Sequence, residues 1–264
     1  MKLLTVYYCF RNPKLFPIHL KKFLFRLFTK EKTDYNWEEK NGLYEIATMA
    51  YLRGILREGD IFIDVGANIG YYEHLFSPLV GSSGRIFAFE PIPELLETKY
   101  ILPENVECFT LACGSEKGTK TLYLSGQNND GSSIYRKFIL RSEGKTIKKT
   151  IEVSVVRLDE FLKEKKVGKI KLIKIDTELY DFEVLKGLSG YFDSGERPII
   201  VCEVQSFNIW QEVLGQDIQE LIDYMRFYGY EAYNIYLPNQ RVDLTKEIKI
   251  GNIIFKCGSK TKGY

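Results

Sequence analysis

Short apolar runs alternate with helical patterns along most of this 264-residue chain. Four of the runs are mostly apolar and have an acidic residue in their last or second-last position, namely IFIDV (61–65), RIFAFE (85–90), KLIKID (171–176) and IIVCEV (199–204). Each is followed by a segment whose apolar residues have helical spacing. Strands of this kind are buried on both faces, as in a parallel sheet covered by its connecting helices. The sequence therefore predicts a Rossmann-like α/β fold with a mostly parallel sheet.

Further runs extend the predicted sheet. VECFTLAC (106–113) and EVSVV (152–156) are predicted strands, and the polar segment 127–149 between them is predicted to be a loop or hairpin insertion. The last two runs, EAYNIYL (231–237) and NIIFKC (252–257), have no convincing helix between them. This predicts an antiparallel strand pair at the sheet edge.

The N-terminal residues differ from the rest of the chain. We expect residues 1–40 to form a helical extension and residues 41–264 to form the main domain, which opens with a helix over 41–56. Leu15 to Lys30 alternates Phe and Leu with Lys and Arg, so a helix there would carry an apolar stripe beside a basic one. One interpretation is that this helix packs on the main domain. The other is peripheral contact with a membrane surface or a partner.

The composition excludes several classes of function. The chain has 37 basic and 35 acidic residues, so its formal charge of +2 supplies little of the positive field that nucleic-acid binding needs. The five cysteines show no CxxC spacing, which favours reduced thiols in a cytoplasmic protein. The two histidines lie in separate predicted elements, so no metal site is predicted.

A glycine-rich turn, DVGANIG (64–70), follows the first predicted strand and opens a helix. Such a turn can present backbone N–H groups to a polar ligand, although it can also be a tight corner without one. Asp64 favours the ligand, because a carboxylate at the end of a buried strand needs a partner. The ammonium group of an amino acid is a suitable one.

The second predicted strand ends at Glu90, where an acid can accept both hydroxyls of a ribose. The alternative is an acid at the N-terminus of the next helix. Both NAD and S-adenosylmethionine would use such a carboxylate. NAD sites have the pattern G-x-G-x-x-G, whereas here Gly66 and Gly70 are separated by three residues. This spacing and the antiparallel pair favour S-adenosylmethionine, which has no pyrophosphate.

Together these motifs resemble the FkbM-type methyltransferases. The matching motifs are D-V-G-A-N-I-G-Y-Y (64–72), G-R-I-F-A-F-E-P (84–91), G-S-S (131–133), R-L-D-E-F-L (157–162) and L-I-K-I-D (172–176). The resemblance implies a class I methyltransferase fold that transfers a methyl group from S-adenosylmethionine to a hydroxyl of a sugar, polyketide or similar small molecule. The donor pocket that it implies, with one residue of the third strand added, consists of Asp64, Gly66, Asn68, Gly70, Glu90 and Ala112.

The resemblance also places Asp176, at the end of the KLIKID strand, beside the transferred methyl group. Candidate groups for removing the proton of the acceptor hydroxyl are Asp176, Glu178, Glu203 and His74. Histidine has the most suitable ordinary pKa. The alternative for His74 is a packed or donor-side histidine, and for Asp176 and Glu203 it is a structural acid that caps a helix.

One departure from the family pattern leaves other functions open. The family continues D-V-E-G-A-E, whereas this chain has Leu179 in place of the glycine and Tyr180 after it. A degenerate methyltransferase fold that acts as a binding or membrane-associated scaffold is one alternative to an O-methyltransferase. A nicotinamide-dependent oxidoreductase is the other.

Overall fold

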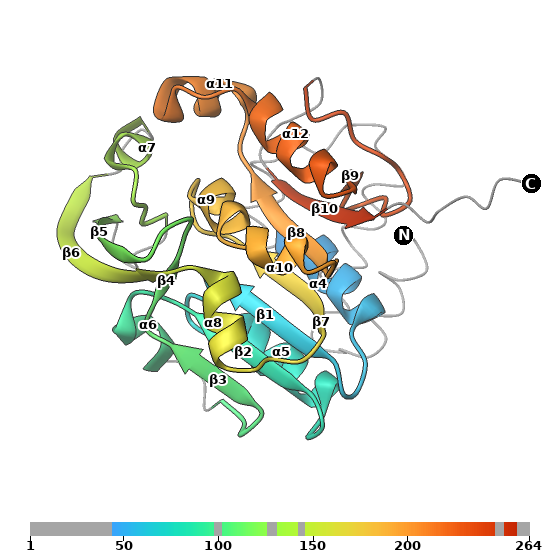
Figure 1. Ribbon diagram of the computed structural model, residues 1–264. Helices are drawn as coiled ribbons and strands as arrows, with labels where there is room; N and C mark the ends of the chain where they lie inside the picture. The colour runs from blue at the N-terminus through green and yellow to red at the C-terminus, as the bar shows by residue number, and fades with distance from the viewer. Residues whose placement is uncertain (1–43, 98–101, 126–130, 142–145, 246–250, 258–264) are drawn as a thin grey trace, which may run out of the picture. The chain divides into compact units, whose positions relative to one another are not determined.

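The computed structural model describes residues 44–97, 102–125, 131–141, 146–245 and 251–257 (Figure 1). The extension predicted for residues 1–40 and its boundary at residue 41 lie outside these ranges. The chain divides into two compact units. One contains α4 (Tyr44–Ile55), which is the described part of the helix predicted over 41–56, together with Ile235–Pro238. The other contains Leu56–Asn234 and the chain from Asn239 onward, and it holds every candidate site residue.

The second unit is built on a seven-stranded sheet with the order β3-β2-β1-β7-β8-β10-β9. Its strands are β1 (Ile61–Val65), β2 (Arg85–Phe89), β3 (Val106–Phe109), β7 (Ile170–Ile175), β8 (Ile199–Val204), β9 (Tyr230–Asn234) and β10 (Gly251–Cys257). The first five in chain order are parallel to one another, and β10 lies between β8 and β9, antiparallel to both. The predicted fold, a mostly parallel sheet with a terminal antiparallel pair, is confirmed.

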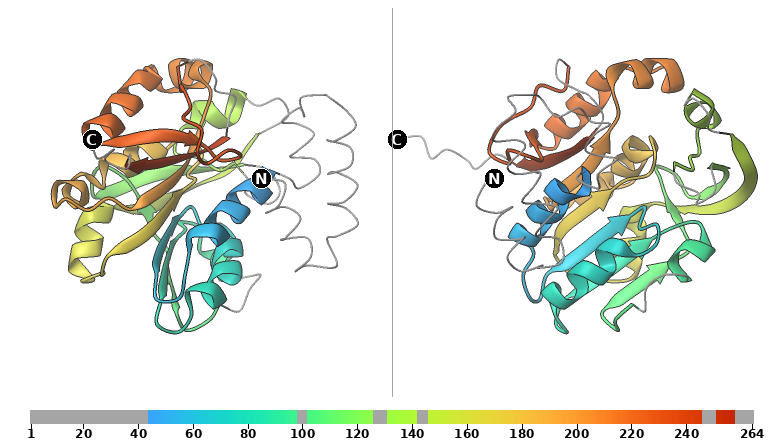
Figure 2. Two further views of the ribbon diagram at one scale, coloured as in Figure 1. Left: turned by 90° about the vertical axis from the view of Figure 1, so that its right-hand side faces the viewer. Right: turned by 180° about the vertical axis from the view of Figure 1, so that it is seen from behind.

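Helices cover both faces of this sheet (Figure 2). The helices of this unit include α5 (Tyr71–Val80), α6 (Pro93–Glu97), α8 (Leu158–Glu164), α9 (Asp181–Lys186), α10 (Ser189–Asp193), α11 (Phe207–Ile209), the π-helix η1 (Trp210–Leu214) and α12 (Ile218–Phe227). Residues such as Ile63 and Ile173 face the helices that follow β6, in one core with Leu158 and Leu221. Since side chains alternate along a strand, Asp64 and Lys174 point to the opposite face, where α5 packs.

A separate three-stranded sheet has the order β4-β6-β5. Its strands are β4 (Ala112–Cys113), β5 (Gly118–Ser125) and β6 (Ile147–Val156). The placement of EVSVV in the main sheet is therefore wrong, because this run belongs to β6. Val153 and Val155 are buried whereas Glu152 and Ser154 are exposed, so the strand has a single packed face. VECFTLAC also divides between the two sheets, into β3 and β4.

The insertion predicted at 127–149 is a hairpin rather than a plain loop. β5 and β6 form its antiparallel arms, α7 (Arg136–Arg141) lies between them, and β6 begins at Ile147, inside the predicted loop. The helical segment predicted after KLIKID is likewise two helices, α9 and α10. The chain bends at Gly187, where a Cβ atom would overlap the carbonyl oxygen of Gly114.

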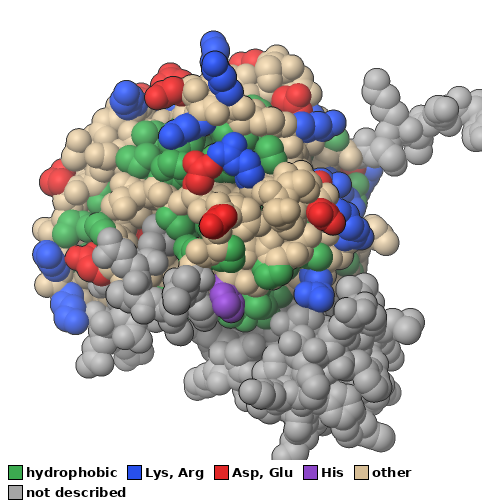
Figure 3. Space-filling view, turned by 90° about the horizontal axis from the view of Figure 1, so that it is seen from below, with side chains coloured by type: hydrophobic (Ala, Val, Ile, Leu, Met, Phe, Trp, Pro, Cys, Tyr) green, Lys and Arg blue, Asp and Glu red, His purple; other side chains and the backbone are tan. Residues whose placement is uncertain are grey.

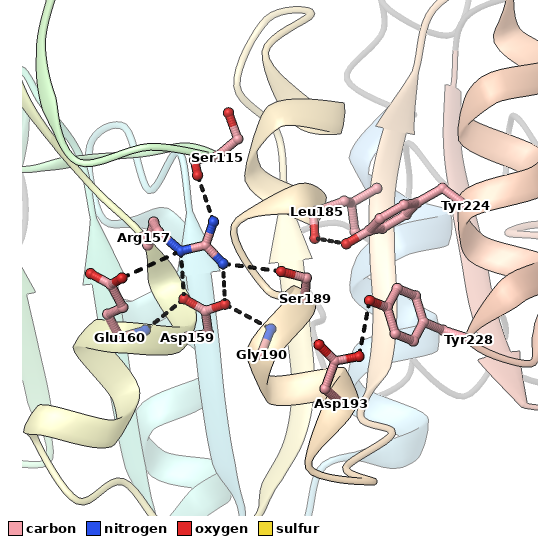
Figure 4. Close-up of polar contacts among 10 residues, drawn as sticks. All are labelled: Ser115, Arg157, Asp159, Glu160, Leu185, Ser189, Gly190, Asp193, Tyr224 and Tyr228. Carbon is pink, nitrogen blue, oxygen red and sulfur yellow. Dashed lines mark hydrogen bonds and ion pairs between the residues drawn. The ribbon is translucent and has the colours of Figure 1, made fainter.

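The R-L-D-E-F-L motif joins the second sheet to α8 and α10 (Figure 4). The guanidinium group of Arg157 donates to both carboxylate oxygens of Asp159, at 3.1 and 2.5 Å, and to the carbonyl oxygen of Ser115 at 2.6 Å. Asp159, which is 8% exposed, also accepts from the backbone N–H of Gly190 at 2.8 Å. These contacts give Arg157 and Asp159 a structural role.

Asp159→Ala should therefore destabilise the fold by about 3 kcal/mol, because the change removes a buried ion pair and leaves backbone donors without an acceptor. The measurement is urea unfolding followed by circular dichroism. Asp193→Asn is the matched control, since Asp193 is exposed and accepts one hydrogen bond, from the Tyr228 hydroxyl at 3.2 Å. Equal stability of the two variants would contradict the structural role.

Candidate functional site

The glycine-rich turn brings the ends of β1 and β7 together. Gly66 has a φ of +88°, and a Cβ atom there would overlap the carbonyl oxygen of Asp176. The backbone N–H of Asp176 in turn donates to the carbonyl of Val65 at 2.9 Å. Only glycine combines this conformation with so close an approach. Gly66 therefore fixes the glycine-rich turn beside Asp176, the acid that the sequence singles out for catalysis.

The backbone N–H groups of the turn are used inside the protein. Those of Gly66 and Ala67 donate to the carbonyl of Phe89 at 2.9 and 3.1 Å, and that of Asn68 donates to Glu90 Oε2 at 3.0 Å. The N–H of Gly70 donates to the carbonyl of Ala67 at 3.0 Å. The turn is thus braced against the end of β2. We expect side chains, rather than these four N–H groups, to hold a ligand.

Glu90 takes one of the two roles that its sequence position suggested, that of an acid before a helix, and it also holds the glycine-rich turn. Its Oε1 accepts the N–H of Ile92 at 3.0 Å, as expected of an acid that precedes a helix, while its Oε2 holds Asn68. The side chain is 6% exposed, and burial raises its pKa from 4.5 to about 7. Ala112, the proposed addition to the pocket, is buried in a small apolar cluster that contains Ile92.

A lysine that sequence reasoning missed lies among the acids. Asp64 and Lys174 are paired in register on β1 and β7, and both are buried. The Lys174 Nζ atom lies 3.7 Å from Asp64 Oδ1 and 3.2 Å from Asp176 Oδ2. Asp64 therefore has an ammonium partner within the protein, at ion-pair distance. The signal was a lysine inside the apolar run LIKID, two residues before the acid.

Glu73 is a second buried acid on this face of the sheet. Its side chain and that of Asp64 are fully buried and interact with each other, and Lys174 Nζ lies 3.7 Å from Asp64 Oδ1. Burial raises the pKa of both groups, and the negative charge of Asp64 raises the pKa of Glu73 further. The site therefore carries an excess of acids, which suits a ligand with positive charge.

The remaining catalytic candidates divide into two groups. Glu203 and Asp176 lie next to each other at the ends of β8 and β7. Each follows a member of the pair Cys202 and Ile175, which lie opposite each other in these two strands. Glu203 is buried and accepts from Gln205 Nε2 at 2.9 Å, whereas the Asp176 side chain is 25% exposed. His74 is exposed on α5, outside the buried cluster. Asp176 and Glu203 thus lie at adjacent strand ends, and His74 does not lie with them.

The turn after β7 is held by Asp181 and by Ser133, neither of which was a candidate site residue. Asp181 is buried and accepts the N–H groups of Thr177 at 2.9 Å and Leu179 at 3.1 Å. The Ser133 hydroxyl, from the G-S-S motif, donates to the carbonyl of Glu178 at 2.7 Å. The hairpin that carries Ser133 is therefore attached to the turn beside Asp176.

Leu179, which stands where the family has glycine, keeps a backbone conformation that favours glycine. Its φ is +81°, and its side chain is 3% exposed. A residue with a Cβ atom is strained there, so we expect Leu179→Gly to be more stable than Leu179→Ala by about 1 kcal/mol. Urea unfolding measures the difference.

The matched control is Leu185, which is fully buried within α9. There glycine should be less stable than alanine by about 1 kcal/mol, because the backbone is an ordinary helix. If the alanine variant were more stable than the glycine variant at position 179 as well as at position 185, Leu179 would not be strained.

The surface and the remaining side chains add three observations. Basic and acidic side chains are interspersed on the face shown in Figure 3. Within the described ranges, no group of three or more His, Cys, Asp or Glu residues is arranged to hold a metal ion. The helices of the described residues are all too short or too polar to cross a membrane.

The amino-acid sequence is similar to those of two characterised methyltransferases. The chain is 27% identical over 171 residues to the hexuronic acid methyltransferase AglP of Haloferax volcanii, which covers 63% of this chain and 66% of the relative. It is 32% identical over 170 residues to the 31-O-demethyl-FK506 methyltransferase FkbM of Streptomyces tacrolimicus, which covers 52% of this chain and 64% of the relative. The chain thus spans slightly less than two thirds of the length of these relatives.

Among solved structures, the S-adenosylmethionine-bound fibrillarin of Aeropyrum pernix aligns with a TM-score of 0.44 and 14% identity, over 79% of this chain and 73% of that chain. A SAM-dependent methyltransferase of Aquifex aeolicus aligns with a TM-score of 0.42 and 16% identity, over 84% and 93% respectively. The model of the methyltransferase FkbM domain matches residues 64–232, which include the glycine-rich turn, Glu90, Lys174 and Asp176. The chain belongs to the FkbM family of S-adenosylmethionine-dependent methyltransferases.

Proposed function

We propose that this chain transfers the methyl group of S-adenosylmethionine to a hydroxyl oxygen of a sugar, a glycan or another small molecule. The observation that carries the proposal is the position of Asp176. This partly exposed acid lies at the carboxyl end of β7, directly beside the glycine-rich turn at the end of β1. Ligands of open α/β sheets bind outside the carboxyl ends of the strands.

The described residues fit the donor. When bound, S-adenosylmethionine supplies a methyl group on a positively charged sulfur, which an oxygen nucleophile can attack. Glu90 would accept the ribose hydroxyls, and Gly66, Asn68 and Gly70 would form the wall of the pocket. Asp64, Glu73 and Asp176 interact with one another and share the ammonium group of Lys174, so the acids beside the turn outnumber this cation and favour a positively charged ligand. Ala112 would line the pocket near Ile92.

The acceptor hydroxyl needs to be oriented, and its proton has to leave. We assign both tasks to Asp176, whose carboxylate would hold or accept the proton while Glu178 assists. Glu203 lies at the same edge of the sheet and is the second candidate. His74 is the least favoured candidate, because its side chain is exposed on α5.

Two properties of relatives support this acceptor class. By its name, one relative methylates a hexuronic acid, which is a sugar. The other methylates 31-O-demethyl-FK506, in which the oxygen at position 31 lacks its methyl group. Neither relative is a nucleic-acid enzyme by name, in agreement with the near-neutral charge of this chain. A cytoplasmic location, and contact of Leu15 to Lys30 with a membrane surface, stay predictions.

The test is a screen with methyl-tritiated S-adenosylmethionine against hexuronic acids, glycans and lipid-linked sugars. We expect label to enter a sugar acceptor, and mass spectrometry and NMR of the product to locate a methyl ether on a hydroxyl oxygen. A methyl ester on a carboxyl oxygen, or label on a nitrogen or carbon atom, would overturn the assignment to a hydroxyl. Donor binding without transfer to any acceptor would favour the scaffold instead.

A further inference from the structure

Lys174 is an unusual residue for the place that it occupies. It is the second-last residue of β7, in the centre of the sheet, and its side chain is 3% exposed. Its strand neighbours Leu172, Ile173 and Ile175 are fully buried apolar residues. Removing an ammonium group from water costs several kcal/mol unless close partners compensate for the loss. A methionine or leucine would satisfy packing alone, so the charge has to serve another purpose.

The contacts of Lys174 join the two halves of the site. Its Nζ atom lies between Asp64 on β1 at 3.7 Å and Asp176 at the end of β7 at 3.2 Å. The ring of Tyr72, from the first turn of α5, lies 4.8 Å from the same atom and adds a cation–π contact. Three elements therefore hold the ammonium group in one place.

The surrounding charges explain what the ammonium group does. Asp64 comes from β1, Glu73 from α5, Asp176 from β7 and Glu90 from the end of β2, and all four can carry negative charge. Without a cation between them, Asp64 and Asp176 would repel each other, since two negative charges at close range repel more strongly in a buried site than in water. Of these two, Asp176 is the partly exposed one and has room to turn outward.

We propose that Lys174 is a positioning residue for methyl transfer, whose ammonium group fixes the carboxylate of Asp176 beside the donor turn. This inference rests on the proposed function, because it gives Asp176 the acceptor hydroxyl. The alternative is that Lys174 only neutralises the buried Asp64 and stabilises the fold. The two views differ in what happens at Asp176 when the lysine is replaced in a folded protein.

The first experiment needs no acceptor. Each variant is titrated with S-adenosylmethionine by calorimetry, and the carbon resonance of the bound donor is recorded by NMR with a ¹³C-labelled methyl group. We expect Lys174→Met and Asp176→Asn to bind the donor within about threefold of wild type and to displace this resonance. The double variant should show no further displacement, because the lysine acts through the acid.

Two controls accompany these variants. Lys174→Arg keeps the charge and should restore the resonance toward its wild-type position. Lys171→Met removes a lysine from the same strand whose side chain is exposed, and it should leave both affinity and resonance unchanged.

The second experiment uses the acceptor identified by the radiolabel screen. Lys174→Met should lower kcat by about tenfold, within the range of coupling energies between contacting residues, and leave the acceptor KM within about threefold. Lys174→Arg should recover part of kcat. In the Asp176→Asn background, Lys174→Met should lower kcat by less than about twofold.

The outcomes separate the positioning role from the proposed function. A resonance that moves in Asp176→Asn but not in Lys174→Met overturns the positioning role alone. A resonance that moves in neither variant overturns the placement of Asp176 beside the methyl group, and the positioning role with it. Loss of donor binding in Lys174→Met alone would show that the ammonium group acts on the donor turn instead.

Folding of Lys174→Met is a separate requirement, because the change leaves buried carboxylates without their cation. If this variant does not fold, Asp64→Asn/Lys174→Met removes one charge of each sign and is compared with Asp64→Asn alone. A displaced resonance and a lower kcat in the double variant support the positioning role, and identical behaviour of the two proteins overturns it.

Discussion

Asp176→Asn should lower the turnover number by about 10²- to 10⁴-fold, which is the range that general base catalysis contributes. Asparagine keeps the shape of the side chain and part of its hydrogen bonding, but it cannot accept the hydroxyl proton. Donor affinity should change little, because Glu90 and the glycine-rich turn are intact. The measurement is kcat at saturating donor and acceptor, with calorimetry for the donor.

A competing view is that alignment of the two substrates does nearly all the work and that water takes the proton. Near-wild-type kcat in Asp176→Asn would decide for that view and move the search to Glu203 and then to His74. Asp193→Asn is a suitable control, since it makes the same chemical change at an exposed residue at the end of α10. It should leave kcat unchanged.

The centre of the main sheet could be predicted from the sequence because the strands β1, β2, β7 and β8 are buried on both faces. A strand such as β1 has an almost unbroken apolar sequence, and a helix with regular spacing follows it. β6 could not be placed in the same way, since its alternating residues show only that one face is buried. They do not show which sheet provides the partner. The pairing of β6 with β4 and β5 depends on contacts far apart in the sequence.

The acids of the site were predictable because strand ends are visible in the sequence. Asp64, Glu90 and Asp176 each follow an apolar run, and parallel strands bring such ends to one edge. Lys174 was missed because its meaning depends on the register of β1 against β7, which pairs it with Asp64. Glu73 was missed because burial of a residue on the first turn of α5 follows from tertiary packing.

Glycine positions show the same limit. The sequence suggested that Gly66 allows a ligand to approach the backbone. In the structure, the group that approaches is the carbonyl of Asp176. The glycine therefore connects two strands of the site, and this purpose could not be read from the motif alone.

The donor affinity should depend on Glu90 and on pH. Glu90→Gln should weaken S-adenosylmethionine binding by about ten- to a hundredfold at pH 8, the loss expected for hydrogen bonds to a charged group. Glutamine is preferable to alanine here, because its single side-chain oxygen can still accept the N–H of Asn68, while its NH2 group replaces the oxygen that accepts the N–H of Ile92. Glu107→Gln on β3 is the control, since Glu107 pairs with Arg85 on the surface.

The pH dependence follows from the raised pKa of Glu90, which is about 7 because the side chain is buried. The ionised form accepts ribose hydroxyls, so donor affinity should rise with pH through 7 and level off above it, with a loss of about tenfold between pH 8 and pH 6. Stability of the ligand-free protein should change in the opposite sense. A carboxyl group with a raised folded pKa binds its proton more tightly when folded, so its contribution to stability falls as pH rises from 4.5 to 7. Calorimetry from pH 6 to 8.5 tests the first expectation, and Glu90→Gln should remove most of the slope. A donor affinity that is equally steep in Glu90→Gln and in wild type would assign the titration to Asp64 and Glu73 and contradict the role of Glu90.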